Sequence, residues 1–243
     1  MNTAVTPTTW EDYFAGGVPT AAYFHVKLKQ LRRIVDEART DHKFGVISLA
    51  YIGLVAYFET FSKDHFAAIV NIAPTLTRRL SENGQNTFID ASHFSDLTLN
   101  FGERIGFHIA ENFDFGTSQK VNALYSALLR LSPFSKDESR KFDSILNDRN
   151  LIVHNGGTFT ASYVKSATKR FRNTDSARAY WDGLEIDAER LLSDIQFLES
   201  IGKKLVFSSH AALGEYIKTE RVKLSSRRKS AYIALKWWDE FGA

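Results

Sequence analysis

The chain has 243 residues, of which 44% are hydrophobic and 13% are aromatic. This composition is typical of globular proteins and excludes the disordered and fibrous classes. Cysteine is absent, which excludes disulfides, thiolate zinc sites and a cysteine nucleophile. Residues 1–10 lack the basic and apolar regions of a signal peptide, and no uncharged apolar stretch reaches the roughly 18 residues of a membrane span. We therefore expect a soluble, cytoplasmic protein that does not associate with a membrane.

The formal net charge is +3, but the positive charge is concentrated late in the chain. Residues 203–236 contain nine lysines and arginines and only two glutamates. Such a segment is either a solvated helical surface that keeps the protein soluble or a binding surface for a polyanion.

Apolar residues recur at spacings of three and four in most long windows, and the chain has only four prolines, which together predict an all-α fold. The predicted helices cover residues 20–39, 43–72, 97–111, 118–131, 136–155 and 187–207. Two short basic helices are expected after residue 208, and residues 81–87 and 158–182 are expected to be loops. The length favours one domain at residues 1–207, with its core at about 43–207, and a basic helical extension at 208–243.

Two of the predicted helices matter most for function. The helix 43–72 is the most apolar, and we expect it to be buried on most sides. The helix 136–155 has clear signals at both ends. Ser135 followed by Glu138 is the capping-box arrangement, and Gly156 and Gly157 come where a left-handed turn ends a helix.

Motifs of the common enzyme classes are absent. The chain has no GxGxxG, P-loop, GxSxG or HExxH motif, so dinucleotide, nucleoside-triphosphate, serine-hydrolase and zincin chemistry lack their usual starting point. His108 and Glu111 form at most half of a helical metal site, and such a pair is more often a surface pair. We therefore expect no metal site and no cofactor.

One run of residues carries chemistry, the sequence DRNLIVHNGG from Asp148 to Gly157. At 100° per residue, Arg149 lies about 20° from the centre of the apolar face that Phe142 defines. The same face includes Ile145, Leu146 and Val153. A permanently charged guanidinium on a buried face needs a carboxylate, a helix C-terminus or a bound phosphate beside it.

A polar stripe lies next to that apolar face and carries Asp143, Asn147, Asn150 and His154. Arg149 and His154 are about 140° apart on one ideal helix, so they do not face each other. A site that uses both would need the helix end to unwind, or a second copy of the helix packed against the first.

Arg149, Asn150 and His154 match in full the Arg-x(4 to 6)-His motif of the HEPN superfamily, in which asparagine often follows the arginine. The chain resembles these small helical domains over residues 43–207, with an inserted middle segment. A weaker resemblance extends to Glu59 and Lys63, where related proteins tend to carry polar residues that face the motif. Many toxin members have a tyrosine two positions after the histidine, whereas this chain has Gly156, so features tied to that tyrosine do not carry over.

The resemblance implies a HEPN-like antiparallel helical bundle that acts as a metal-independent endoribonuclease. In such proteins two domains form a homodimer and bring two motifs into one cleft, in a stress, toxin–antitoxin or antiviral defence role. Histidine suits removal of the ribose 2′-hydroxyl proton or protonation of the leaving 5′-oxygen. Arginine suits the developing charge of the phosphorane. Asn150 is expected to bond the phosphate or to orient His154. RNA is the expected partner, with a neutralising or regulatory protein as a further one.

Other positions are assigned to RNA binding. Residues expected to position the substrate are Asn147, Asn150, Asn155, Glu59 and Lys63. Basic residues expected to contact RNA are Arg170, Arg172, Arg227, Arg228 and Lys229. Trp237 and Trp238 either pack the tail or stack on bases.

Each site residue also has a purely structural interpretation. Arg149 could form a buried ion pair with Glu59 that fixes helix packing. His154 could be a C-terminal histidine that the helix dipole favours and that bonds a carbonyl of the last turn. Asn155 could be the helix C-cap, and Glu59 and Lys63 could form an exposed salt bridge.

Two further functions stay open besides the ribonuclease. One is a catalytically silent HEPN-like module that dimerises and binds a nucleotide, RNA or a partner protein, for which Arg149 would matter and His154 would not. The other is an interaction protein, such as an inhibitor or adaptor, that works through residues 203–243 and their tryptophans. In that case the motif would not matter.

Overall fold

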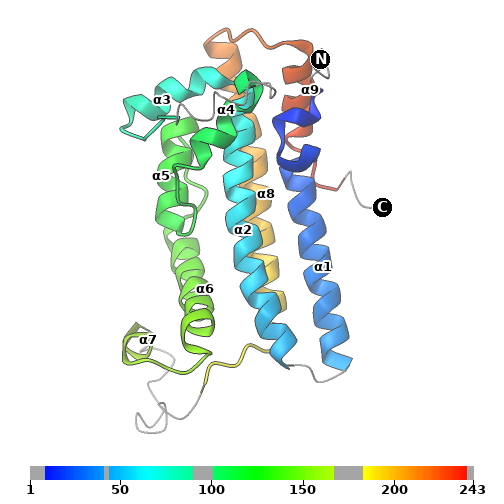
Figure 1. Cartoon of the computed structure of the whole chain (residues 1–243), viewed down its shortest axis with the longest axis vertical. Helices are drawn as coiled ribbons and strands as arrows, with labels where there is room; N and C mark the ends of the chain where they lie inside the picture. The colour runs from blue at the N-terminus through cyan, green and yellow to red at the C-terminus, as the bar shows by residue number, and fades with distance from the viewer. Residues whose placement is uncertain (1–8, 41–43, 90–100, 167–182, 240–243) are drawn as a thin grey trace, which may run out of the picture.

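The computed structural model describes residues 9–40, 44–89, 101–166 and 183–239. Three long helices lie side by side along the molecule (Figure 1): α1 (Thr20–Thr40), α2 (Phe44–Ile72) and α8 (Ala188–Thr219). A further column consists of α5 (Ser118–Leu129) followed by α6 (Lys136–Asn155). The described residues contain helices and no strand, apart from an isolated antiparallel bridge between Thr158 and Gly183, so the all-α prediction is confirmed.

Shorter elements close the two ends of the bundle. The helices α3 (Thr77–Glu82), α4 (Phe101–Ala110) and α9 (Ser226–Ala234) lie at one end, with 3-10 turns at Glu11–Tyr13, Ala15–Gly17 and Pro74–Leu76. The helix α7 (Ala161–Ser166) lies at the other end, beside the end of α6 (Figure 1).

The helix α2 is the centre of the core because its sequence is apolar nearly all round. It packs against α1, α4, α6, α8 and α9. Its Tyr51, Leu54 and Phe58 are fully buried. By length and composition alone, residues 45–72 could also cross a membrane, and the core helix of a bundle has the same composition. The prediction that this helix is buried on most sides is confirmed for residues 65–72, whereas Val46 and Leu49 near its start are exposed.

An aromatic layer joins α2 to the helices on both of its sides. Phe24 of α1 stacks on Phe61 with ring centroids 4.5 Å apart, and Phe58 lies 5.3 Å from Phe142 of α6. Phe134, just before α6, stacks on Phe142 at 5.0 Å. These rings fix the position of α6 against α2, and therefore the position of the motif that α6 carries.

The helix boundaries agree with the sequence for most elements and differ near the C-terminus. The helix expected at 187–207 continues to Thr219, and it replaces the first of the two short basic helices expected after residue 208. The domain boundary expected between residues 207 and 208 therefore falls inside α8. Residues 208–219 contain no proline, so no strong stop signal ends the helix there. Two short helices, α3 and α7, were missed.

His65 of α2 is buried and joins this helix to α1 and α8 by hydrogen bonds. Its Nε2 lies 2.7 Å from Ser209 Oγ, and its Nδ1 lies 3.0 Å from Thr20 Oγ1. Ser209 also donates to the carbonyl of Val206, so we assign the His65 proton to Nε2, leaving Nδ1 to accept from Thr20. His65 and Ser209 are completely buried. This pair therefore stabilises the core and is not a nucleophile and base that a substrate could reach.

We predict that two groups of α2 shift stability in opposite directions on acidification. Burial lowers the pKa of His65 from 6.5 to about 3, so the unfolded chain binds the extra proton and stability falls as the pH drops below about 6.5. Burial raises the pKa of Asp64 from 3.8 to about 6, so here the folded chain binds the extra proton and gains stability between pH 6 and 4. The Asp64→Asn protein lacks this gain. It should lose stability more steeply than wild type between pH 6 and 4, by up to about 1 kcal/mol per pH unit, in urea titrations. Parallel curves would contradict the assignment.

Candidate functional site

The helix α6 is fixed at both ends. Ser135 and Glu138 form the predicted capping box, with Ser135 N donating to Glu138 Oε2 at 2.7 Å. Gly156 ends the helix in the left-handed region at φ 57°. The helix is continuous to Asn155, so its end does not unwind within one copy. Arg149 and His154 therefore keep the separation of about 140° that an ideal helix gives them.

Arg149 is half-buried and its guanidinium is held on one side. Its Nη1 donates to Oδ1 of Asn150 at 3.0 Å. Its Nε is buried and has no hydrogen-bond partner in the described part of the chain. Among residues 9–40, 44–89, 101–166 and 183–239, no carboxylate lies within 4.0 Å of this guanidinium, so the buried ion pair with Glu59 is not present at contact distance. An orphaned buried donor on a fixed cation suits a ligand oxygen.

Glu59 of α2 lies close enough to Arg149 for the two charges to interact. Burial raises the pKa of Glu59, the nearby charge of Arg149 lowers it, and Asp114 raises it again. Asp114 belongs to the connection between α4 and α5, and its Oδ1 accepts from Gly116 N at 2.6 Å while its carboxylate pairs with Lys120. The expectation that Glu59 lies beside the motif is consistent with this arrangement.

Lys63 is half-buried one turn further along α2. Its charge lowers the pKa of Asp64, although burial of that carboxyl dominates and raises the pKa overall. No ion pair between Glu59 and Lys63 occurs in the described residues, so the exposed salt bridge between them is not formed. That Glu59 and Lys63 position the substrate stays a prediction.

His154 and Asn155 are exposed in the last turn of α6, and Asn147 and Asn150 are exposed earlier in the same helix. His154 makes no hydrogen bond or ion pair within the described segments, so it is not held on a carbonyl of the last turn. The C-cap is Gly156 rather than Asn155. Asn150 bonds Arg149 and not His154, which corrects one of its two expected roles.

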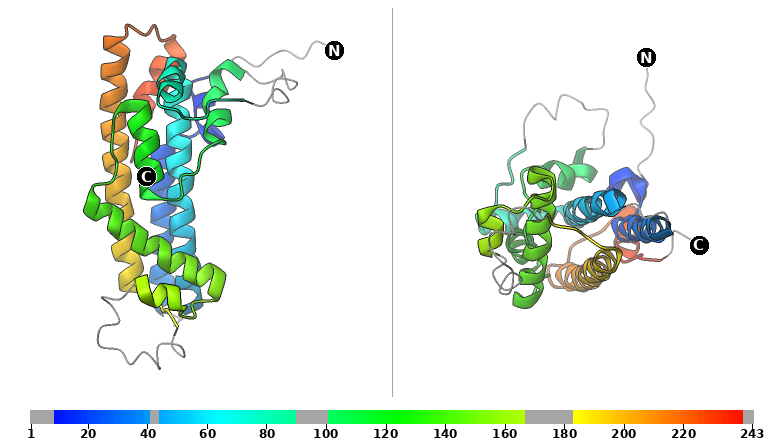
Figure 2. Two further views of the ribbon diagram at one scale, coloured as in Figure 1. Left: turned by 90° about the vertical axis from the view of Figure 1, so that its left-hand side faces the viewer. Right: turned by 90° about the horizontal axis from the view of Figure 1, so that it is seen from below.

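The last turn of α6 buries a different side from the one expected. Val153 was placed on the apolar face but is 44% exposed, whereas Leu151 is 3% exposed. The reason is that α6 is inclined to the long helices (Figure 2), so its last turn extends beyond α2. The buried side there is turned instead toward α7, whose Tyr163 bonds Asp148.

Sequence reasoning missed the buried carboxylate beside the motif. Asp148 is 1% exposed and accepts hydrogen bonds from Arg190 of α8 and from the Tyr163 hydroxyl. Arg190 also approaches Asp194, which is 6% exposed and accepts from the Tyr51 hydroxyl at 3.4 Å. The aspartate directly before Arg149 gave no signal of burial, because the helical period places it about 120° from Phe142 and its partners are 15 and 42 residues away.

The basic residues assigned to RNA do not join this site. Arg227, Arg228 and Lys229 lie on α9, at the end of the bundle opposite to the end of α6 (Figure 1). The helix α8 runs between the two ends, and its 32 residues correspond to about 48 Å. Arg170 and Arg172 lie outside the described residues. Trp238 is 4% exposed against Phe24 and His25, so it packs the tail and does not stack on bases.

Comparison of the chain with protein-family models, with characterised proteins and with solved structures finds no match.

Proposed function

We propose that this chain is a metal-independent endoribonuclease that acts as a homodimer, with Arg149 of one copy and His154 of the other in one cleft. One observation carries the proposal. A single straight helix holds a fixed cation with an orphaned buried donor, Arg149, and five residues later an exposed imidazole, His154. The two groups suit the two needs of phosphodiester cleavage, charge stabilisation and proton transfer.

The proposed reaction uses the RNA itself as the nucleophile. His154 takes the proton of the ribose 2′-hydroxyl, and the 2′-oxygen forms a bond to the adjacent phosphorus. The bond from phosphorus to the 5′-oxygen of the next nucleotide breaks, and that oxygen takes up the proton that His154 removed. The products are a 2′,3′-cyclic phosphate and a 5′-hydroxyl, and the balance requires no other reactant.

Arg149 stabilises the negative charge that develops on the phosphorane oxygens. The Asn150 side chain holds Nη1 of Arg149 at 3.0 Å, which leaves the other guanidinium donors for the phosphate. Glu59 places a carboxyl group near Arg149 but does not neutralise the guanidinium charge, because it does not pair with the guanidinium at contact distance. The second half of the cleft must come from another copy, since Arg149 and His154 point to different sides of α6.

The motif resembles those of HEPN ribonucleases, which supports a stress, toxin–antitoxin or antiviral role and a cytoplasmic location. The basic residues of α9 would then contact RNA about one bundle length from the cut, and a neutralising protein partner belongs to the same proposal. The alternative is a catalytically silent HEPN-like module that binds RNA or a nucleotide. The cleavage experiment distinguishes it from the ribonuclease.

The test is cleavage of a mixed cellular RNA pool by purified protein in EDTA. Wild type should leave 2′,3′-cyclic phosphate ends. His154→Ala should lower cleavage by about 10²- to 10⁴-fold, because the proton transfer is lost. Arg149→Ala should lower it by about 10²- to 10³-fold, because the phosphorane loses its cation.

The matched control is Arg140→Ala, which removes an exposed arginine of the same helix that pairs only locally with Asp137. It should cleave like wild type. Equal cleavage by all four proteins would assign the activity to a contaminant or to another site. No cleavage by a wild-type protein that is dimeric would favour the silent module.

A further inference from the structure

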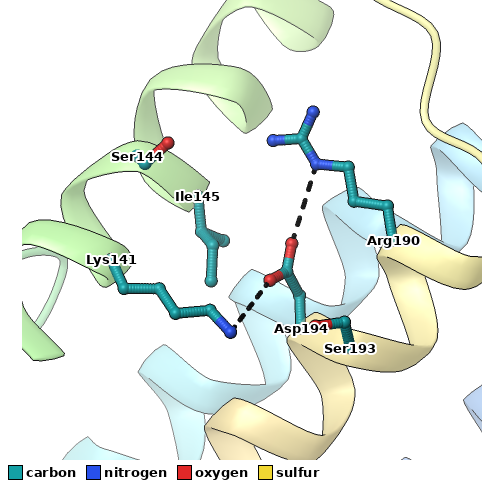
Figure 3. Close-up of a pocket in the computed structure, with 6 residues that line it drawn as sticks. All are labelled: Lys141, Ser144, Ile145, Arg190, Ser193 and Asp194. Atoms are coloured by element: carbon teal, nitrogen blue, oxygen red, sulfur yellow. Dashed lines mark ion pairs between the residues drawn. The ribbon is translucent and has the colours of Figure 1, made fainter. Parts of the chain in front are cut away.

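An open cavity of about 370 Å³ lies between α6 and α8. Its lining residues are Lys141, Ser144 and Ile145 of α6 and Arg190, Ser193 and Asp194 of α8 (Figure 3). A volume of this size is within the range of small-molecule sites. The ribonuclease proposed above uses none of these side chains.

The two cations of the cavity come from opposite walls and meet at one carboxylate (Figure 3). Lys141 Nζ lies 3.7 Å from Asp194 Oδ1, and Arg190 Nε lies 3.9 Å from Asp194 Oδ2. Both distances exceed those of good charge-assisted hydrogen bonds. Both contacts are long ion pairs, so the Lys141 ammonium and the guanidinium edge of Arg190 that Asp148 does not hold keep donors for a ligand.

Burial separates the two signs of charge within the cavity. The Asp194 side chain is 8% exposed, whereas the side chain of Lys141 is 43% exposed and that of Arg190 is 23% exposed. Asp148 holds Arg190 from behind and is itself 1% exposed. The carboxylates thus form the floor and hold the guanidinium in place, while the ammonium and the guanidinium edge face the opening.

The remaining polar groups of the cavity are also donors. The side-chain hydroxyls of Ser144 and Ser193 make no hydrogen bond within the described part of the chain, so both are available to a ligand. Two hydroxyls, an ammonium and a guanidinium edge present donors to one volume. An oxyanion with several acceptor oxygens satisfies such a set, and arginine's planar fork favours phosphate.

We propose that this cavity binds a phosphate group, between Lys141 and Arg190. The group could come from a free mononucleotide, as a phosphate monoester, or from a nucleic-acid strand, as a phosphodiester. The site does not depend on the ribonuclease proposal, because neither Arg149 nor His154 lines it.

The experiment is a titration of the full chain followed by backbone amide NMR, with adenosine, AMP, inorganic phosphate and a short DNA oligonucleotide as probes. The oligonucleotide has phosphodiesters but no 2′-hydroxyl, so it cannot be cleaved by the proposed reaction. AMP or the oligonucleotide should shift the amides of Ser144, Ile145 and Ser193. Tighter binding of AMP identifies a monoester site, and tighter binding of the oligonucleotide identifies a strand site.

Lys141→Ala should weaken binding of the tighter probe by about tenfold, the effect of one charge-assisted hydrogen bond. Lys136→Ala removes an exposed lysine of the same helix that does not line the cavity, and it should bind like wild type. Arg190 is left intact because it also holds Asp148.

Three results would overturn the proposal. Adenosine that binds as tightly as AMP would show that the phosphate is not recognised. A polyamine such as spermidine that shifts the same amides while the phosphate probes do not would show that the carboxylates dominate. Shifts that persist unchanged in Lys141→Ala would place the ligand elsewhere.

Discussion

Mixing the inactive Arg149→Ala and His154→Ala proteins should restore cleavage to about a quarter of the wild-type rate, because in a two-fold dimer each cleft takes its arginine from one copy and its histidine from the other. A mixed dimer then has one cleft with both defects and one cleft with none. Half of the dimers in an equal mixture are mixed, and each has one of its two clefts intact. The measurement is the rate of appearance of cyclic-phosphate ends after subunit exchange.

The reason lies in the geometry of α6. The helix is continuous to Asn155 and is capped at both ends, so Arg149 and His154 project about 140° apart and cannot meet on one copy. His154 is exposed and makes no hydrogen bond within the described residues, which leaves it available to a second copy.

The control is a mixture of His154→Ala with His154→Gln, which contains no intact histidine in any combination and should stay inactive. Failure of the first mixture, with subunit exchange verified by light scattering or by differently tagged copies, would contradict a cleft that two copies share. Activity in the control mixture would show that His154 is not the proton-transfer group.

The local signals of α6 were sufficient to predict that helix. Ser135, Glu138 and Gly156 act on groups within a few residues of themselves, so their effect can be read from the sequence. The end of α8 was missed because no such stop signal exists near residue 207, and tertiary packing decides how far the helix continues.

The surroundings of Arg149 could be predicted only in part. The helical period placed Arg149 toward the core and the polar stripe outside, and Asn147, Asn150 and His154 are exposed. The period could not show that α6 crosses the bundle at a slant (Figure 2). Val153 was therefore predicted to be buried but is exposed, and the burial of Leu151 was not predicted. The Asp148–Arg190 pair spans 42 residues, and no local spacing encodes such a contact.

Gly106→Ala should destabilise the fold by about 3 kcal/mol or more, which lowers the melting temperature by about 10 °C for a chain of this size. A Cβ atom at Gly106 of α4 would lie 2.1 Å from the carbonyl oxygen of Ala67 and 2.8 Å from Oδ1 of Asn71, both on α2. The first of these is backbone and cannot turn away, so the two helices would have to separate. Gly106 N also lies 2.6 Å from Asn71 Oδ1, and separation would break this hydrogen bond.

Asn71 makes the cost larger because it is completely buried and donates to the carbonyl of Tyr13 at 3.2 Å. A shift of α4 therefore leaves a buried amide oxygen without its donor. Gly53→Ala is the matched control within the neighbouring helix α2, since its added Cβ would meet nothing closer than Tyr57 Cε2 at 3.8 Å. That variant should be unchanged or more stable by about 0.5–1 kcal/mol, because alanine favours a helix over glycine. If both variants unfold at the same urea concentration, α2 and α4 do not cross at Gly106.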